Sequence, residues 1–252
     1  MSADRFRKGR PGLPAGYLAW EAAGLRWLAA AGGARVAEVL HVTPEHLDLT
    51  RLEPTSPTPA QAEDLGRALA RTHDAGAAAH GSPPDGWEGD GWLGPLSEPL
   101  PLPLRPCETW GHFYAEQRVL HTAHLAGLEG AELALMERVA DRLRDGELVP
   151  EEPAARIHGD LWSGNLVWTA DGGVLIDPAA HGGHRESDLA MLALFGAPHL
   201  GRILAGYEEE HPLADGWQQR VGLHQLHPVL LHAALFGGGY REQALAIARR
   251  YA

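Results

Sequence analysis

Residues suited to phosphate chemistry gather in one short stretch, ARIHGDLWSGNLVWTADGGVLIDPAA, at positions 155–180. Asn165 follows Asp160 by five residues, and Asp177 ends the apolar run Val174–Ile176. Carboxylate and amide oxygens are hard ligands that hold Mg²⁺, and a separate carboxylate can take the proton of an attacking hydroxyl. The spacing predicts a phosphoryl-transfer site in which Asp160 is the base and Asn165 and Asp177 bind Mg²⁺ next to ATP.

The order His-Gly-Asp, then Asn five residues after the Asp, then a strand-terminal Asp, matches the spacing of a kinase catalytic loop. The alternative is a polar loop with incidental Asp and Asn on a structural hairpin. The kinase interpretation is preferred because element type and spacing agree. We expect His158 to brace the loop by hydrogen bonding, and Gly159 and Gly164 to permit tight turns.

A second pair of residues fits the same chemistry. Of the 21 lysine and arginine residues, Lys8 is the only lysine, which indicates either a required ammonium group or chance survival in a basic tail. Glu21 shares one helical stripe with Leu18, Leu25 and Leu28, where a carboxylate needs a cationic partner. Kinase-like phosphate positioning uses a strand lysine held by a helix glutamate, so we expect Lys8 to pair with Glu21 and bind the cofactor.

The elements that must position these residues are predicted from periodicity and turn signals. The N-terminal piece contains a helix at 16–31 and two short strands at Arg35–His41 and His46–Leu52. Three prolines in Glu53–Pro59 predict a stiff linker. The predicted division is a reduced N-terminal α/β lobe at 1–53 and a helical C-terminal lobe at 54–252.

The C-terminal lobe is expected to be mainly helical, with the site on one strand–turn–strand hairpin at 155–180. Residues 81–106 are dense in glycine and proline and predict a long surface loop. The fold class predicted is α+β, a two-lobed protein-kinase-like fold. Helices are predicted at Ala60–Asp74, Trp110–Ala126 and Ala131–Arg144 and from Asp188 to the end.

Composition restricts the partners and the compartment. The formal net charge of −12 argues against nucleic acid or an anionic membrane as the main partner. A single cysteine, Cys107, cannot form an internal disulfide, and the polar start Met1–Arg10 is unlike a signal peptide. No apolar run approaches the ~20 residues of a membrane span. These features predict a cytoplasmic protein that acts on a small molecule, and they leave its oligomeric state open.

Four segments together resemble the fructosamine kinase (ketosamine-3-kinase) family, within the aminoglycoside and choline kinase-like group. HGDLWSGN at 158–165 looks like the family's catalytic loop, and IDPAAHGGHRESDLAMLALFG at 176–196 is similar to its metal-binding segment. EAAGLRWL at 21–28 resembles its Glu-bearing helix, and LHQLHPVLLHAALFGGGY at 223–240 its C-terminal helical signature. The resemblance extends over nearly the whole chain.

The resemblance implies transfer of the γ-phosphate of ATP to a sugar hydroxyl of a ketosamine, such as fructosyl- or ribulosyl-lysine on glycated amines and proteins. Phosphorylation at the third sugar carbon destabilises the adduct and regenerates the amine, which is a deglycation activity. It also implies that Trp162 lies near the acceptor sugar, and it assigns phosphates to Lys8 and Glu21, the base role to Asp160, and Mg²⁺ to Asn165 and Asp177.

One departure from the family concerns the N-terminus. Members normally begin with a strand hairpin whose glycine-rich turn covers the phosphates, whereas only seven residues precede Lys8 here. We expect either a start site set too late or a reduced form with a weaker ATP clamp. The alternatives to a ketosamine kinase are a kinase for an aminoglycoside or amino alcohol, and a pseudokinase.

Other residues have two interpretations. His181, close to Asp177, either contacts the substrate or packs and hydrogen-bonds within the loop. His224 and His227 lie three residues apart without a zinc-like ligand pattern, so they are expected to be structural or exposed. The tryptophans of the middle region either line a substrate cleft or anchor the proline-rich loop; they are Trp87, Trp92 and Trp110.

Overall fold

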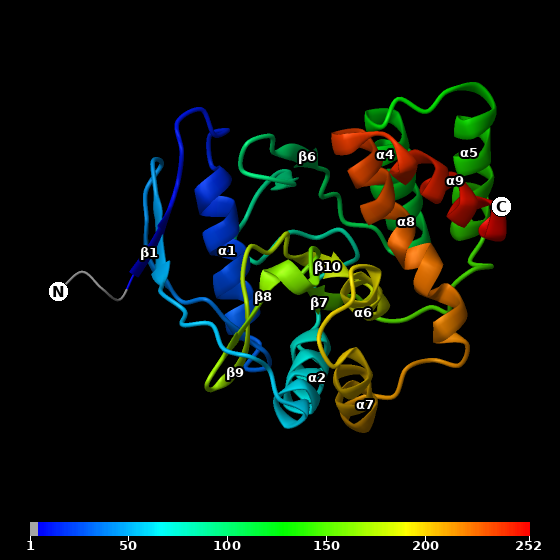
Figure 1. The fold of residues 1–252 in the computed structure, drawn as a ribbon. Helices are drawn as coiled ribbons and strands as arrows, with labels where there is room; N and C mark the ends of the chain where they lie inside the picture. The colour runs from blue at the N-terminus through cyan, green and yellow to red at the C-terminus, as the bar shows by residue number, and fades with distance from the viewer. Residues whose placement is uncertain (1–4) are drawn as a thin grey trace.

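The structure is a computed structural model that describes residues 5–252. Figure 1 shows the N-terminal strands and helix α1 (Tyr17–Ala29) on one side. On the other side lie the helices α4 (His121–Leu125), α5 (Gly130–Arg144), α8 (Trp217–Phe236) and α9 (Gly239–Tyr251). Short strands and helix α6 (Arg185–Leu194) lie between these two groups. The mixture of small sheets and many helices is the α+β class that the sequence predicts. Across residues 5–252, no helix combines the length and the apolar composition that a bilayer crossing requires.

The N-terminal sheet is antiparallel, with strand order β1-β4-β3. Its strands are β1 (Arg5–Lys8), β3 (Val39–Val42) and β4 (Leu47–Thr50), and helix α1 (Tyr17–Ala29) packs against them. Leu18 and Leu25 of α1 are buried with Leu47 and Leu49 of β4. Because these side chains fall on one face of each element, Glu21, on the same stripe, is drawn into the interior.

The strand predicted at Arg35–His41 is in fact two strands that join different sheets. Strand β2 (Arg35–Val36) pairs in parallel with β9 (Gly172–Leu175), which pairs antiparallel with β8 (Leu166–Thr169). The chain then turns and continues as β3, which pairs with β4. The N-terminal segment is therefore hydrogen-bonded directly to the hairpin that carries the site, and the division at 53/54 stays a prediction.

Helix α2 (Pro59–Asp74) begins where the proline-rich linker ends. The Thr58 hydroxyl accepts a hydrogen bond from the Gln61 backbone, the Gln61 side chain accepts one from the Thr58 backbone, and Pro59 occupies the first helical position. This reciprocal cap satisfies two backbone N–H groups that a helix start leaves free. Helix α2 lies beside α7 (Leu200–Glu210), and Leu65 and Leu69 enter the shared core.

The region 81–106, predicted to be a loop, contains a short hairpin. Strands β5 (Gly91–Leu93) and β6 (Leu100–Leu102) pair antiparallel. Leu93 and Leu102 are buried with Trp20 of α1 and Leu231 of α8. The hairpin escaped prediction because three-residue strands show too few alternations to stand out among prolines.

The C-terminal helices surround the largest core. Residues 110–125 form one helical segment whose middle part is a π-helix. Its three parts are α3 (Trp110–Tyr114), η1 (Ala115–Leu120) and α4 (His121–Leu125). Side chains such as Phe113 and Val119 pack against the other helices of this group. Those helices are α5 (Gly130–Arg144), α8 (Trp217–Phe236) and α9 (Gly239–Tyr251). Between them and the hairpin lie α6 (Arg185–Leu194) and the pair β7 (Ala155–Ile157) and β10 (His181–Gly183).

Candidate active site

The predicted catalytic loop connects β7 to β8, and it includes the 3₁₀ turn Ser163–Asn165. Strands β8 and β9 pair with Leu166 opposite Leu175. One residue beyond this pair, the Ile176 N–H donates to the Asn165 carbonyl over 3.0 Å. The hairpin register therefore brings Asn165 and Asp177 to the same end of the sheet.

Buried hydrogen bonds hold the loop in place. The Asp188 carboxylate of α6 accepts from the backbone N–H groups of His158 (2.7 Å) and Gly159 (3.0 Å). The His158 ring bonds through Nε2 to the Ile176 carbonyl (2.9 Å), and Nδ1 accepts from the Asp160 N–H (3.2 Å). Burial lowers the pKa of His158, so the ring is neutral and its Nε2 carries the proton. His158 therefore braces the loop instead of performing the chemistry.

At two positions of the loop, neighbouring atoms lie too close for any side chain, so glycine is required. Gly159 has φ of 79°, and a Cβ there would lie 2.3 Å from the Ala179 carbonyl oxygen. A Cβ on Gly164 would lie 2.2 Å from the Trp162 ring, which packs over it. Asp177 is also left-handed, with φ of 53°, a conformation that costs energy for a non-glycine residue and is found at functional sites.

Asp160 and Asn165 are in direct contact. The Asn165 Nδ2 donates to Asp160 Oδ2 (2.9 Å) and to the Asp160 backbone carbonyl (2.8 Å). Burial raises the Asp160 pKa to about 8, with help from the negative charges of Asp177 and Asp188 and against the Asn165 hydrogen bond. Within the described chain, Asp160 Oδ1 accepts no hydrogen bond, so one carboxylate oxygen is fixed and the other is available to a substrate hydroxyl.

Lys8, Glu21 and Asp177 form a second group, which we call the Lys8 cluster. The Lys8 ammonium lies 2.8 Å from Glu21 Oε2 and 3.0 Å from Asp177 Oδ1. Burial alone would lower the Lys8 pKa, but the two carboxylates raise it above its usual value. Two carboxylates share one ammonium, and burial together with the Asp177 charge raises the Glu21 pKa to about 7. The cluster therefore carries more negative than positive charge.

Both groups open into one cavity of about 350 Å³. Asp177 is 42% exposed there, whereas Lys8 is 8% exposed. The far wall is largely apolar and comes from α6, through Met191, from Phe195 just after α6, and from α8, through Phe236 among others. Sequence reasoning missed this wall because helical hydrophobic residues give no local sign that they face a cavity. A volume of this size is typical of a small-molecule site.

Trp162 borders the cavity, as the resemblance implies. It is 39% exposed, and its ring meets Phe195 edge-on with centroids 5.8 Å apart. Trp92 of β5 also lines the cavity and contacts Tyr17 and Trp87, so it both lines the cleft and anchors its own hairpin. Trp110, in contrast, is buried in the C-terminal core.

His181 takes a different position from the other predicted site residues. It is 4% exposed, and its Nδ1 donates to the Ala179 carbonyl over 2.7 Å. Its Nε2 accepts from Arg118 over 3.1 Å. His181 does not line the large cavity but a smaller hollow on the other side of Asp160. Burial and the Arg118 charge lower its pKa to about 3, so the ring is neutral.

The residues at the end of the hairpin suit a hard divalent cation. Asn165 uses its amide nitrogen on Asp160, and its Oδ1 accepts no hydrogen bond from residues 5–252. Asp177 has one oxygen near Lys8 and is substantially exposed to the cavity. One amide oxygen and one carboxylate on a cavity wall match the few protein ligands that Mg²⁺ uses next to phosphates.

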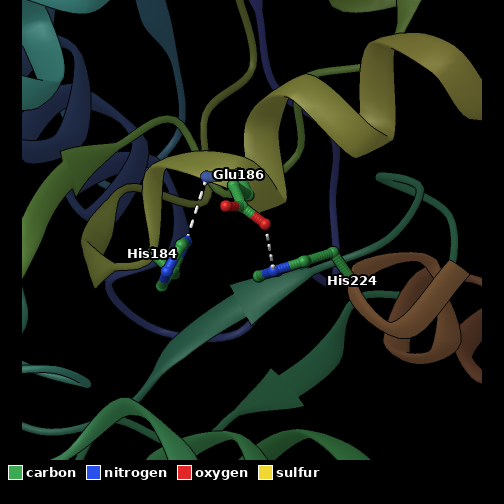
Figure 2. Close-up of side chains that lie close together, drawn as sticks. All are labelled: His184, Glu186 and His224. Carbon is green, nitrogen blue, oxygen red and sulfur yellow. Dashed lines mark hydrogen bonds and ion pairs between the residues drawn. The ribbon is translucent and has the colours of Figure 1, made fainter. Parts of the chain in front are cut away.

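Figure 2 shows another group of potential ligands, Glu186, His184 and His224. We call these three residues, together with the neighbouring Arg220, the Glu186 cluster. Arg220 donates to both Glu186 oxygens, through Nε (2.9 Å) and Nη2 (2.5 Å). His184 Nδ1 accepts from the Glu186 N–H (3.1 Å) and caps α6, and His224 Nε2 lies 3.3 Å from Glu186 Oε2. Because a guanidinium already satisfies the carboxylate, this cluster ties α6 to α8.

Comparison with known proteins agrees with this geometry. A family model described as fructosamine kinase matches residues 14–251. The chain belongs to the fructosamine kinase family. The crystal structure of a fructosamine-3-kinase homologue from Thermobifida fusca is 46% identical and superposes with a TM-score of 0.88, over 97% of this chain and 84% of that one.

Relatives in other organisms carry related names. A probable ketoamine kinase of Synechocystis sp. is 36% identical over 71% of this chain and 58% of that protein. The ketosamine-3-kinase of Mus musculus is 36% identical over 56% of this chain and 47% of its own length. The matched segment therefore spans about half of these two relatives.

The fold extends beyond the family. A choline kinase of Streptococcus pneumoniae superposes with a TM-score of 0.61 over 100% of this chain and 88% of that one, at 14% identity. At this identity the likeness concerns the fold alone. The fold is the α+β, protein-kinase-like architecture of the aminoglycoside and choline kinases, as predicted.

Proposed function

We propose that the protein is a cytoplasmic, ATP- and Mg²⁺-dependent kinase that phosphorylates a sugar hydroxyl of ketosamines. The observation that carries the proposal is the arrangement around one cavity of a base-like carboxylate, Asp160, and of the Lys8 cluster. Membership of the fructosamine kinase family supports the reaction class, and the name of the mouse relative supports the acceptor.

In the proposed reaction, Asp160 accepts the proton of the acceptor hydroxyl, whose oxygen forms a bond to the γ-phosphorus. The bond between that phosphorus and the β–γ bridging oxygen breaks, and ADP leaves with the electron pair. Asn165 holds one oxygen of Asp160, so the carboxylate is oriented before the substrate arrives. A raised pKa favours proton transfer near neutral pH because the base then has a useful affinity for the proton.

Phosphate binding in the proposal depends on the Lys8 cluster. Glu21 fixes the Lys8 ammonium at the cavity wall, where it can contact phosphate oxygens. Asn165 and Asp177 would hold Mg²⁺, which neutralises phosphate charge when bound. Trp162 offers an aromatic face to the apolar side of the acceptor. Loss of the phosphorylated sugar would regenerate the amine, which makes the activity a deglycation step.

The experiment is an ADP-release assay with Mg²⁺, ATP and a panel of acceptors. We expect turnover with fructosyl- or ribulosyl-amines and little with an aminoglycoside or choline. Asp160→Asn keeps the shape but removes the base, and we expect activity to fall roughly 10²- to 10⁴-fold. Asp171→Asn, on the exposed turn of the same hairpin, is the matched control and should be fully active. Turnover of an aminoglycoside or choline without a ketosamine would reassign the acceptor, and full activity of Asp160→Asn would remove the proposed base.

A further inference from the structure

A second hollow lies directly behind Asp160. Its volume is about 40 Å³, and it shares with the large cavity the residues Leu93, Asp160, Met191 and Leu231. A single water needs about 10 to 15 Å³ by the same measure, so the hollow can take a few waters or a short hydroxylated chain. Asp160 therefore borders both spaces.

Arg118 is the unusual side chain of this hollow. It belongs to the π-helical turn η1, and such turns occur frequently at functional sites. Its Nη1 donates to the carbonyls of Pro103 (3.0 Å) and Gln117 (2.9 Å), and its Nη2 to His181 Nε2 (3.1 Å). A guanidinium has five N–H groups, so two remain without an acceptor in residues 5–252.

The positive charge of Arg118 also has no carboxylate partner among residues 5–252. The side chain is 2% exposed and stacks 4.4 Å from the centre of the Phe113 ring. Among residues 5–252, no carboxylate forms an ion pair with it, and burial lowers its pKa to about 9. A buried cation with unpaired N–H groups and no counter-charge is expensive, so a ligand that supplies oxygen atoms would be bound favourably.

The other walls of the hollow suit a hydroxylated carbon chain. The Ser187 hydroxyl bonds to His224 Nδ1 over 2.9 Å; it donates there because His224 Nε2 faces Glu186, and its lone pairs stay free to accept. Ile157 and Met191 contribute apolar surface. Polyols both donate and accept hydrogen bonds and carry C–H groups between the hydroxyls, which suits a wall that contains both polar and apolar groups.

We infer that the inner hollow is the sugar subsite of the acceptor, where Arg118 donates hydrogen bonds to the hydroxyl oxygens beyond the reacting carbon. The inference rests on the proposed function and says which part of the ketosamine enters which space. The reacting hydroxyl lies at Asp160, the polyol tail points inward, and the amine-bearing end points outward past Trp162. His181, whose lone pair fixes one arm of Arg118, is a positioning residue.

The test measures binding of unreactive ketosamines to the full chain by calorimetry. One ligand is a fructosyl-amine without the reacting 3-hydroxyl, and the second also has hydrogen in place of the tail hydroxyls. Hydrogen bonds to a charged group are strong, so we expect the wild type to bind the first ligand roughly 10- to 100-fold more tightly. In Arg118→Met the two ligands should bind with similar affinity, because the donor is gone.

Arg156→Met is the matched control. Arg156 also stacks on an aromatic ring, 4.4 Å from the centre of Trp27, and donates to the carbonyls of Trp27 (2.7 Å) and Gly76 (3.2 Å). It lines neither space. We therefore expect Arg156→Met to keep the full preference for the hydroxylated ligand.

The outcomes separate the subsite from the proposed function. Equal affinity of the wild type for the two ligands overturns the subsite, and this comparison holds even if Arg118→Met fails to fold. The subsite is also overturned if Arg118→Met still binds the hydroxylated ligand more tightly than the ligand without tail hydroxyls. Tail-dependent binding without phosphate transfer to the 3-hydroxy ligand removes the proposed function and keeps the subsite. Phosphate transfer to the 3-hydroxy ligand, combined with binding that does not depend on the tail hydroxyls, keeps the proposed function and removes the subsite.

Discussion

The Lys8 cluster and the Glu186 cluster are built from the same kinds of group, yet they are balanced differently. In the Glu186 cluster, Arg220 contacts both oxygens of one carboxylate, and the neighbouring histidines are neutral. In the Lys8 cluster, one ammonium serves two carboxylates, and the buried Glu21 Oε1 has no hydrogen-bond partner. In the first cluster the carboxylate is paired, although His184 Nε2 and His224 Nε2 also lack hydrogen-bond partners among residues 5–252. The second cluster differs because it borders the large cavity.

The difference between the two clusters shows that buried ionic groups can serve either to connect helices or to bind a ligand. A buried ion pair contributes little net stability, because desolvation cancels much of the attraction, but removing one partner is costly. The Glu186 cluster connects α6 and α8, and of its four members His224 alone lines the inner hollow. The Lys8 cluster faces the cavity through Asp177, so its incomplete balance is available to a ligand.

The largest expected effect comes from breaking the Lys8 cluster. Lys8→Met removes the cation that pairs with two carboxylates and should lower activity roughly 10²- to 10³-fold, as loss of one preorganised electrostatic contact does. It should also destabilise the fold by about 3 kcal/mol, because Glu21 stays buried without a partner. Steady-state kinetics and urea denaturation measure the two effects.

The double variant Lys8→Met/Glu21→Leu sharpens this result. Removal of the stranded carboxylate should restore most of the stability and none of the activity. Recovered activity in the double variant would contradict a phosphate-binding role for Lys8.

The Glu186 cluster should respond in stability alone. Arg220→Met leaves Glu186 buried beside neutral histidines, and we expect the free energy of unfolding to fall by about 3 to 5 kcal/mol. The kcat and KM of the folded fraction, measured well below the unfolding temperature, should match the wild type. A large drop in kcat at full folding would mean that the Glu186 cluster also acts on the active site.

The next largest effect is expected from acid, which should lower the free energy of unfolding through the buried histidines. Burial lowers the pKa of His184, His224 and His227 in the folded protein, and that of His181 to about 3. The unfolded chain, with ordinary histidine pKa values near 6.5, therefore binds more protons below that pH. Stability should fall as pH drops below about 6.5, by up to ~1.4 kcal/mol per pH unit for each histidine.

The carboxyl groups of the proposed active site change the stability in the opposite direction over the same pH range. Asp160 and Glu21 have raised pKa values, so near pH 7 the folded protein holds protons that the unfolded chain releases. Two carboxyl groups offset only part of the effect of four histidines. Urea denaturation at about pH 7, 6 and 5 should show a net loss of stability, and a flat profile would mean that these histidines titrate normally.

The smallest expected effect concerns the cavity rim. Trp162→Phe keeps an aromatic face next to Phe195, whereas Trp162→Ala removes it. We expect the acceptor KM to rise about 2- to 10-fold in Trp162→Ala and less in Trp162→Phe, with the ATP KM unchanged. An increase in the ATP KM alone would place Trp162 on the nucleotide side.

Much of the proposed site was predictable because its signals are local. The spacing from Asp160 to Asn165 and Asp177 reflects one loop and one hairpin, and the structure brings these residues to one cavity. The contact between Lys8 and Glu21 was also expected, since a buried carboxylate needs a cation and the chain has one lysine. The helices predicted up to residue 144 lie within a few residues of their expected positions, whereas the region from Asp188 to the end was predicted only as mainly helical.

The sequence by itself determined the family and the helices up to residue 144, and it indicated the residues proposed to hold phosphate and metal, because each depends on type and spacing over short distances. Only the tertiary structure decided that Arg35–His41 splits between two sheets, that His181 turns away from the large cavity, and that Arg118 enters a hollow behind Asp160. These features arise where segments distant in sequence pack together. Local patterns carry no record of which side chains will border a cavity, because a cavity is formed only when distant segments pack against one another.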